Sequence, residues 1–548
     1  MIKHLVCLAT LLTPLQLRAG ELPDNVGMAA RVCGYAAARQ AAARFFTQIL
    51  PDYSQDTPDS WLISTAKCGG MESVDERGDF VLLGLDTAPP GWAMVLPVRS
   101  AGLYLDSLRS ALGDDHAADG GYTFIDKQEF PDLPGLPPVE QKLCVRVIDQ
   151  KAILAASPET CKAAAALLDK KEPAWLLEKG PEGRLQGSIK GSFIARNRAQ
   201  LFETIFRIQL FATTSLDSPE GIPLASFYTE TMLDLIENPA RIDFEAAFTS
   251  RNTDLTLTLV PKPDSVLAKF LQKQKAPERN LLDVIPGQPI VTAAGRIEGL
   301  ELLEAPYAAS LTRLCKLVPQ RAPNADTAVS WGKERLRRFG AAFGGHFAAA
   351  LVQPPGDSFG VDYLRAYEVK DPARALDAVN WELGTLRKHN AAVENLPEQN
   401  GIRSCKIQHT QRPQPDLLCW TVVNNLLLVA SGANAQANIA KMAQAAATPS
   451  EQAASKSKLY ARATANAPEG AAVTGMFSIS GFLHWVGSSG RQGMETLAAT
   501  EPATGLAAWF SPRPDGSLEV RLRVRASELL DFRKALFGEA PLMALPVQ

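Results

Sequence analysis

The sequence contains few of the residues that build metal sites, sugar-binding platforms or nucleic-acid interfaces. Only six of its 548 residues are histidine, and Phe, Trp and Tyr together make up 7% of the chain. No two histidines stand four residues apart and no CxxC pair occurs, so the common zinc-site spacings are absent. The net charge of −3 gives no overall positive field that would attract nucleic acid or an anionic membrane. We therefore expect no metal, no cofactor and no nucleic-acid partner.

The motifs of the common catalytic sites are also missing. A nucleophile elbow needs Gly-x-Ser-x-Gly, but segment 187–191 has its serine one position too early and segment 487–490 is one residue too short. Neither a Walker phosphate loop nor a Gly-x-Gly-x-x-Gly motif occurs. A carboxylate pair for glycoside hydrolysis would leave no such motif, although the low aromatic content argues against sugar platforms. We predict that the protein is not an enzyme and nominate no catalytic residue.

Long apolar runs are confined to the N-terminus. A short polar start precedes the apolar segment 5–17, and Ala19 offers a small residue for cleavage before Gly20. Residues 1–19 are therefore predicted to be a signal peptide. No later segment reaches the roughly 18 apolar residues of a membrane-spanning helix, so no transmembrane segment is expected in the mature chain. The sequence predicts an exported protein of the periplasm or the extracellular space.

Seven cysteines follow the predicted signal peptide, and an oxidising compartment favours their pairing. We expect up to three disulfides, with Cys315 left over. The candidate disulfide residues are Cys33, Cys68, Cys144, Cys161, Cys405 and Cys419. The alternative is that these cysteines are buried free thiols.

Cys405 and Cys419 form the pair with the most direct argument. They lie in the strand-like segments 402–407 and 417–423, which flank a turn that contains two prolines. Antiparallel pairing would bring facing Cβ atoms to about 4.5–5.5 Å, close to the separation that a disulfide requires. The sequence therefore predicts a disulfide across this hairpin.

A pattern of strand, helix and hairpin recurs along the chain at a displacement of about 271 residues. Val98 ends a strand and is followed by a basic residue and Ser100, a helix-capping residue. Val369 is followed in the same way by a basic residue and Asp371, so the two segments predict equivalent strand ends and helix starts.

Three further matches follow in the same order. The hairpin 143–157 with its turn at 149–151 answers the hairpin 418–431 with its turn at 424–425. Segments 188–191 and 478–481 each open a helix, and the alternating strands 255–259 and 518–522 each precede another. Four ordered matches favour an internal duplication.

The duplication also bears on the cysteines of the first half. Cys144 matches Cys419, but Phe130 stands where a match for Cys405 would fall. We therefore expect Cys161, on the helix that follows, to be the partner of Cys144.

Hairpins followed by helices predict an α+β fold of mostly antiparallel sheets. The strands alternate apolar and polar residues, which indicates one wet sheet face and helices packed on the other face. Two related halves are expected at residues 20–273 and 281–548, with the charged segment 274–280 between them.

Several short segments carry a resemblance to one group of exported proteins. They are Val95-Leu96-Pro97-Val98, Ala155-Ala156-Ser157-Pro158, Leu259-Val260-Pro261-Lys262-Pro263, Ile285-Pro286-Gly287 and Ala293-Ala294-Gly295-Arg296. The pattern resembles uncharacterised exported proteins of the planctomycete and verrucomicrobial kind, which carry domains of unknown function. The resemblance implies an envelope location, no known activity and no functional residue to transfer. The second half departs from it, because Val524-Arg525-Ala526 replaces the Pro-Lys-Pro step.

Three hypotheses about function follow. The first is a non-catalytic binding or scaffolding protein of the cell envelope, whose partner is an unknown envelope protein or an apolar ligand. The second is a carrier of an apolar ligand such as a lipid, because helices laid on a curved antiparallel sheet can enclose one. The third is a hydrolase of envelope glycans or peptides whose site has no recognisable motif.

Overall fold

The computed structural model of the protein describes most of the chain after residue 21. The described residues are 22–49, 59, 62–63, 66–67, 70–87, 91–113, 115–118, 120–128, 139–172, 176, 181–203, 205–206, 221–317, 325–353, 361–388, 392–408, 415–448, 450–479, 481–482 and 505–530. The predicted signal peptide, residues 1–19, lies outside them. In this part of the chain no helix is both long enough and apolar enough to cross a membrane.

The chain divides into two compact units. The first contains the described residues of Met1–Leu201 and Leu233–Val260, and the second those of Phe202–Met232 and Pro261–Ala540. Each unit is built of helices and one run of antiparallel strands, so the predicted mixed α+β fold with antiparallel sheets is confirmed.

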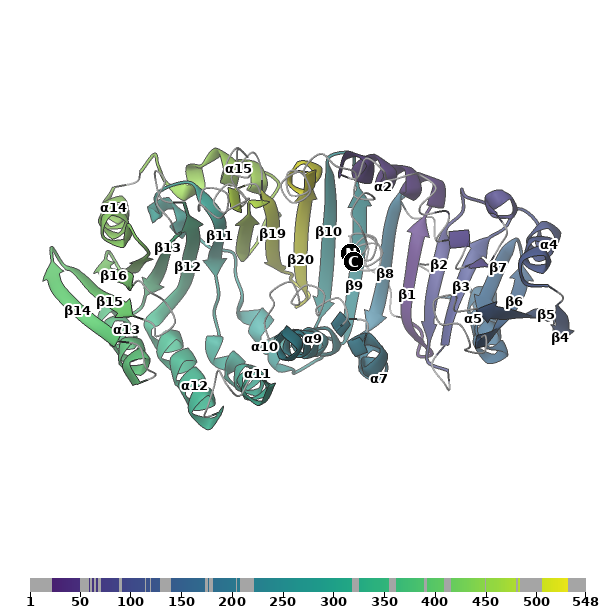
Figure 1. Ribbon diagram of the computed structural model, residues 1–548, viewed down its shortest axis with the longest axis horizontal. Helices are drawn as coiled ribbons and strands as arrows, with labels where there is room; N and C mark the ends of the chain where they lie inside the picture. Colours follow the sequence, from purple (N-terminus) through teal and green to yellow (C-terminus); the bar gives the residue numbers. More distant parts are fainter. Residues whose placement is uncertain are drawn as a thin grey trace. The chain divides into compact units, whose positions relative to one another are not determined.

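Ten strands are present among the described residues of the first unit. They are β1 (Val26–Cys33), β2 (Phe80–Leu85), β3 (Gly91–Pro97), β4 (His116–Ala118), β5 (Gly121–Gln128), β6 (Val139–Ile148), β7 (Lys151–Ala155), β8 (Arg184–Lys190), β9 (Arg241–Phe248) and β10 (Asn252–Val260). Their hydrogen-bonded order is β4-β5-β6-β7-β3-β2-β1-β8-β9-β10, and every pairing is antiparallel (Figure 1). The hairpin that contains Cys144 therefore pairs with the centre of the sheet through β3.

The described part of the second unit also has ten strands. They are β11 (Pro289–Arg296), β12 (Phe343–Val352), β13 (Asp362–Val369), β14 (Ala392–Gln399), β15 (Ile402–Gln408), β16 (Asp416–Val423), β17 (Leu426–Ser431), β18 (Val473–Phe477), β19 (Leu506–Pro512) and β20 (Leu518–Arg525). They pair in the order β14-β15-β16-β17-β13-β12-β11-β18-β19-β20, again antiparallel throughout. Counted along the chain, this is the strand order of the first unit.

Helices occupy corresponding places in the two units. In the first unit they are α2 (Tyr35–Ile49), α4 (Ala101–Leu112), α5 (Pro158–Lys170) and α7 (Gly191–Arg196), while α9 (Gly221–Glu237) begins in the second unit and ends in the first. In the second unit they are α10 (Val266–Lys273), α11 (Glu304–Leu317), α12 (Ala325–Ala342), α13 (Pro372–Lys388), α14 (Ala435–Ala447) and α15 (Lys458–Thr464). Thus α4 and α13 follow the third strand of their units, and α5 and α14 follow the seventh.

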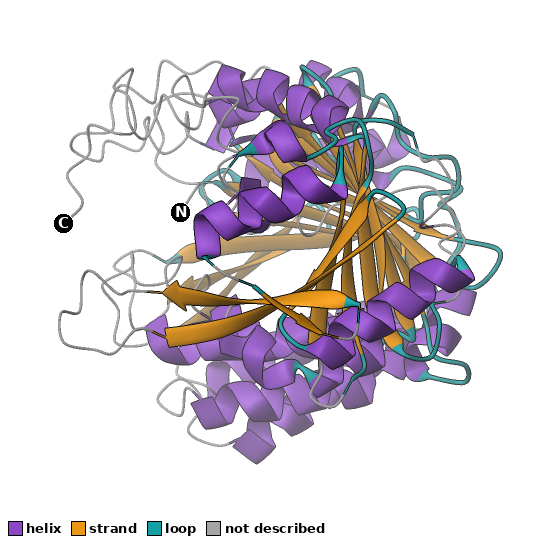
Figure 2. Ribbon diagram, turned by 90° about the vertical axis from the view of Figure 1, so that its right-hand side faces the viewer, coloured by secondary structure: helices purple, strands orange, loops and turns teal. Residues whose placement is uncertain are grey.

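The helices cover both faces of each run of strands, so the prediction of helices on one face only was wrong (Figure 2). Val95 of β3 packs in one core with α5, while its neighbour Leu96 packs in another core with α4. Successive residues of a strand point to opposite faces, so α4 and α5 lie on opposite faces. In the second unit α14 packs with Leu428 and α13 with Val429 in the same way. Since burial of a leucine contributes about 1.5–3 kcal/mol, both faces contribute to stability.

Two-residue turns close the equivalent hairpins β6–β7 and β16–β17. Asp149 and Gln150 have φ of 44° and 61°, and Asn424 and Asn425 have φ of 49° and 58°. Positive φ at both central residues matches the right-handed twist of the flanking strands, and asparagine tolerates it well. The turns predicted at these two places are confirmed, except that Lys151 already belongs to β7.

The edge strands of the two units differ. Strand β4 has three residues, whereas β14 has eight, of which six are exposed. Strand β14 contains Pro397, and its pairing with β15 is irregular between Leu396 and Gln399. Among the described residues each edge strand pairs on one side only.

Candidate ligand-binding groove

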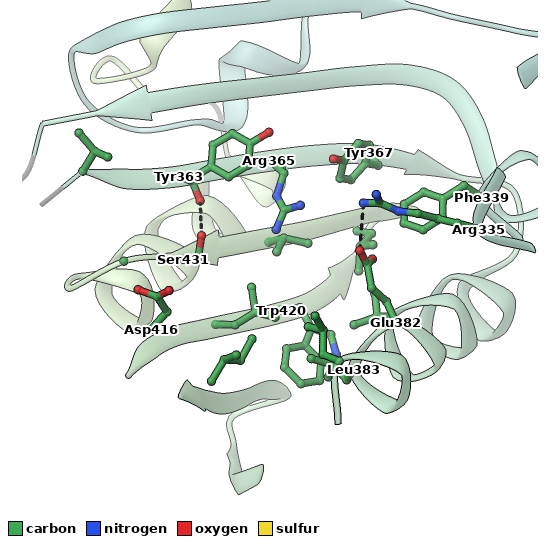
Figure 3. A pocket seen from close by; sticks show the side chains of 18 residues that line it. Arg335, Phe339, Tyr363, Arg365, Tyr367, Glu382, Leu383, Asp416, Trp420 and Ser431 are labelled. Atoms are coloured by element: carbon green, nitrogen blue, oxygen red, sulfur yellow. Dashed lines mark hydrogen bonds and ion pairs between the residues drawn. The ribbon is translucent and has the colours of Figure 1, made fainter. Parts of the chain in front are cut away.

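A groove of about 390 Å³ lies in the second unit between helices α12 and α13 and the face of the sheet formed by β13, β15, β16 and β17 (Figure 3). Its volume is at the lower end of the range for small-molecule pockets. Most of its lining is apolar, and Leu383, Leu418 and Trp420 are among the lining residues. The groove therefore presents a largely apolar surface.

Strand register determines which side chains share the floor of the groove. Tyr363, Arg365 and Tyr367 alternate along β13, so they point to the same face. Arg365 pairs with Val429 on β17, and Val429 pairs with Trp420 on β16. Arg365 and Trp420 consequently lie in one row across three strands.

Arg365 brings a positive charge into this apolar lining. Its Cζ atom lies 4.8 Å from the ring centroid of Tyr363, and Figure 3 shows the side chain between the two tyrosines. Burial raises the pKa of Tyr367, while the charge of Arg365 and its hydrogen bond to the phenol act in the opposite direction. No carboxylate among the described residues forms an ion pair with Arg365, so its charge is not neutralised within that part of the chain.

Two buried N–H groups of this row have no acceptor among the described residues. They are Nε of Arg365 and Nε1 of Trp420, whose side chain is only 4% exposed. A buried donor without an acceptor costs roughly 1–3 kcal/mol. Both atoms are inaccessible to solvent, so neither N–H group opens into the groove.

The acidic residues of the groove lie away from Arg365. Glu382 of α13 forms an ion pair with Arg335 of α12 at 2.9 Å, at one end of the groove. Asp416 lies at the other end, near Ser431 (Figure 3). Asp416 lies two strands away from Arg365 and is displaced from it by four residues along the strand. Strand geometry converts this to roughly 16 Å between the two α-carbons.

A second hollow, of about 570 Å³, contains the buried residue His346. His346 Nε2 accepts a hydrogen bond from the backbone N–H of Glu278 at 3.2 Å, so Nδ1 is the donor to Glu368 at 2.6 Å. Burial opposes ionisation of Glu368, but His346 and Arg279 outweigh it and lower its pKa. Both ring nitrogens have partners inside the fold, which makes His346 a structural link between β12 and β13.

The predicted Cys405–Cys419 disulfide is absent. Cys405 pairs with Leu418, while Cys419 pairs with Ser404, so the two cysteines are offset by one residue and point to opposite faces of the sheet. They are buried free thiols in separate cores, and burial raises the pKa of each to about 11.

The other candidate cysteines are unbonded where they are described. Cys144 and Cys161 pack in the same core as free thiols, and Cys33 and Cys315 are also free and buried. Cys68 lies outside the described residues. The register also shows that Phe124, and not Phe130, occupies the position equivalent to Cys405, because Thr123 pairs with Cys144 as Ser404 pairs with Cys419.

The residues of the groove were not found by motif. A signal was available, since Tyr363, Arg365 and Tyr367 place one charge on a strand face that a predicted helix would cover. No group of three or more His, Cys, Asp or Glu residues suited to a metal ion occurs in the described part of the chain. No protein-family model matches the sequence, and neither a curated protein nor a solved structure matches it.

Proposed function

We propose that residues 20–273 and 281–548 are two copies of one α+β unit, joined by an internal duplication. The common strand order supports this proposal, as does a bulge near the start of the first strand in both units. Val98 N–H donates to Gln150 O at 2.8 Å, and Val369 N–H donates to Asn425 O at the same distance. Val98 directly follows β3 and Val369 is the last residue of β13, which supports the equivalent positions proposed for them.

We further propose that the protein is an exported, non-catalytic binding protein whose second unit holds an apolar ligand. The observation that carries the proposal is the groove over β13, β17 and β16, whose mostly apolar lining contains the guanidinium of Arg365. One charged group on an apolar floor suits a bound molecule with one polar end. An envelope location is supported by the signal-like N-terminus.

The arrangement of acids favours binding over hydrolysis. A glycosidase needs two carboxyl groups that face one bond from about 5 to 9.5 Å apart. Glu382 is paired with Arg335, and Asp416 lies at the opposite end of the groove. This groove therefore lacks the pair of facing carboxylates that the hydrolase hypothesis requires.

Ligand binding is tested with a variant that fills the groove. Leu386 lines the groove and is half-buried, so Leu386→Trp adds bulk where the fold can accommodate it. Protein purified from its native host is analysed by native mass spectrometry and titrated with 1-dodecanol. Wild type is expected to bind dodecanol or retain a small molecule, and the variant to lose both. Equal binding by the two proteins, or none by either, would refute the proposal.

Export is tested separately. Residues 1–25 fused to a periplasmic reporter enzyme should yield activity outside the cytoplasm, and the mature N-terminus should begin at or near Gly20. Intact Met1 on protein that remains in the cytoplasm would contradict an exported location.

A further inference from the structure

We infer that the groove of the second unit binds a single-chain carboxylate amphiphile, with the carboxylate on Arg365 and the hydrocarbon over Trp420 and Leu418. This inference rests on the proposed binding function and adds the chemical class of the ligand. It depends on the charge of Arg365, the shape of its guanidinium and the volume of the groove.

The charge argument concerns Arg365. Its guanidinium lies between Tyr363 and Tyr367, where the surrounding surface is mostly apolar, and no described carboxylate pairs with it. An arginine in such surroundings favours an anion, because charge-assisted hydrogen bonds are about twice as strong as neutral ones. Glu382 does not serve as this anion, since it pairs with Arg335.

The geometry argument concerns the shape of the guanidinium. Arg365 and Trp420 line the groove from the same row of the sheet, so a carboxylate on Arg365 places the hydrocarbon over Trp420. A carboxylate has two oxygens that accept several hydrogen bonds, and it matches the planar fork of a guanidinium. A neutral alcohol would leave the charge of Arg365 without a counterion.

The volume argument limits the size of the ligand. About 390 Å³ corresponds to roughly 13 water molecules at ~30 Å³ each. Such a volume suits one acyl chain of medium length. Leu383, Leu418 and Ile407 supply the apolar walls along which the chain would lie.

The test compares three probes of equal chain length by isothermal titration: dodecanoate, 1-dodecanol and dodecyltrimethylammonium, each below its micellar concentration. Wild-type protein is expected to bind dodecanoate at least tenfold more tightly than dodecanol, and the cationic probe not at all. The preference should fall at high salt, because the ion pair is partly open to solvent.

The decisive variant is Arg365→Met, because methionine is the residue at the same register position of the first unit, Met94. It should bind dodecanol as wild type does and lose at least tenfold in dodecanoate affinity. Arg365→Lys keeps the charge without the planar guanidinium, so its dodecanoate affinity should lie between those of wild type and Arg365→Met. Arg337→Met, which removes an exposed arginine of α12 outside the groove, is the matched control and should bind like wild type.

The outcomes separate this inference from the function on which it rests. If dodecanol binds as tightly as dodecanoate, or Arg365→Met keeps the preference, the carboxylate ligand is refuted while the groove still binds. If Leu386→Trp leaves both probes bound, or neither probe binds to wild type, the binding function itself is refuted.

Discussion

The sheet face beneath α4 in the first unit and the face beneath α13 in the second unit have the same strand register but different chemistry. Met94 pairs with Leu154 in the first unit, and Arg365 pairs with Val429 at the same place in the second. The first face is an apolar core, whereas the second contains a groove with a charge. The difference shows how a few side chains on a fixed frame can change a packed face into a grooved one.

The bulk that fills the two faces also comes from different elements. Helix α4 contributes Tyr104, which is fully buried, where α13 has Ala375. The sheet of the second unit compensates with Trp420 where the first unit has Val145. In the second unit the large residue is on a strand and the small one is on the helix. The helix and the sheet therefore fill the space between them less evenly, which is consistent with a groove.

The largest expected effect is on the first unit. Tyr104→Ala should lower the free energy of unfolding by about 3–5 kcal/mol, because it leaves a cavity and removes a hydrogen bond from the phenol to Ala66 O. Ala375→Gly at the matching position should cost only about 1 kcal/mol, chiefly through helix propensity. Urea denaturation checks both values, and Leu103→Ala on the exposed side of α4 is the control. Equal losses for Tyr104→Ala and Ala375→Gly would break the comparison.

A smaller effect is expected where the two units cap equivalent helices differently. Asp362 is fully buried and accepts hydrogen bonds from Asn434 N–H, Asn434 Nδ2 and Asn438 Nδ2 at the start of α14. Asp362→Ala leaves these donors unpaired and should cost about 2–3 kcal/mol in urea denaturation. Asp377→Ala, an exposed change on α13, is the control, and a loss as small as that of the control would contradict the capping role.

The first unit caps the equivalent helix, α5, in a simpler way. Gly91 occupies the register position of Asp362, and a Cβ there would lie 2.1 Å from Thr160 Oγ1. Ser157 instead caps α5 by accepting a hydrogen bond from Thr160 N–H at 3.2 Å. Ser157→Ala should therefore cost about 1 kcal/mol. A loss that matches Asp362→Ala would show that the two caps are equally important.

The smallest expected effect concerns the thiols of both units. Because the described cysteines are free, a reducing agent should leave the urea midpoint unchanged, whereas loss of a disulfide typically costs about 2–4 kcal/mol. Cys405 and Cys419 should resist alkylation in the native protein, since burial keeps their pKa near 11, and both should react once the unreduced protein is unfolded. Peptide mapping that finds either one protected after unfolding would reveal a bridge.

The sequence predicted the elements of the fold better than their packing. Ser100 caps α4 and Asp371 caps α13 as the sequence indicated, because short polar side chains before a helix have a local effect. The prediction of one wet face failed at β17, whose residues 426–430 are all buried. That unbroken apolar run is typical of a strand covered on both faces.

Register and cavities were harder to predict. The sequence aligned Ile189 with Ile479, whereas the strand pairings align it with Phe477, because Met28 pairs with Ile189 and Val291 pairs with Phe477. A shift by two residues keeps the sheet face, so the apolar pattern cannot detect it. The groove depends on the volumes of side chains from four strands and two helices, and no local pattern encodes that sum.

The edge strand β14 has a consequence for solubility. A long unpaired strand edge is a template on which another chain can add a strand and begin to aggregate. Pro397 lacks the N–H that such pairing requires, the irregular register between Leu396 and Gln399 bends the edge, and Glu394 and Glu398 add like charges. The eight-residue edge of the second unit is thereby protected from intermolecular pairing by chemistry, where the three-residue β4 of the first unit is protected by its shortness.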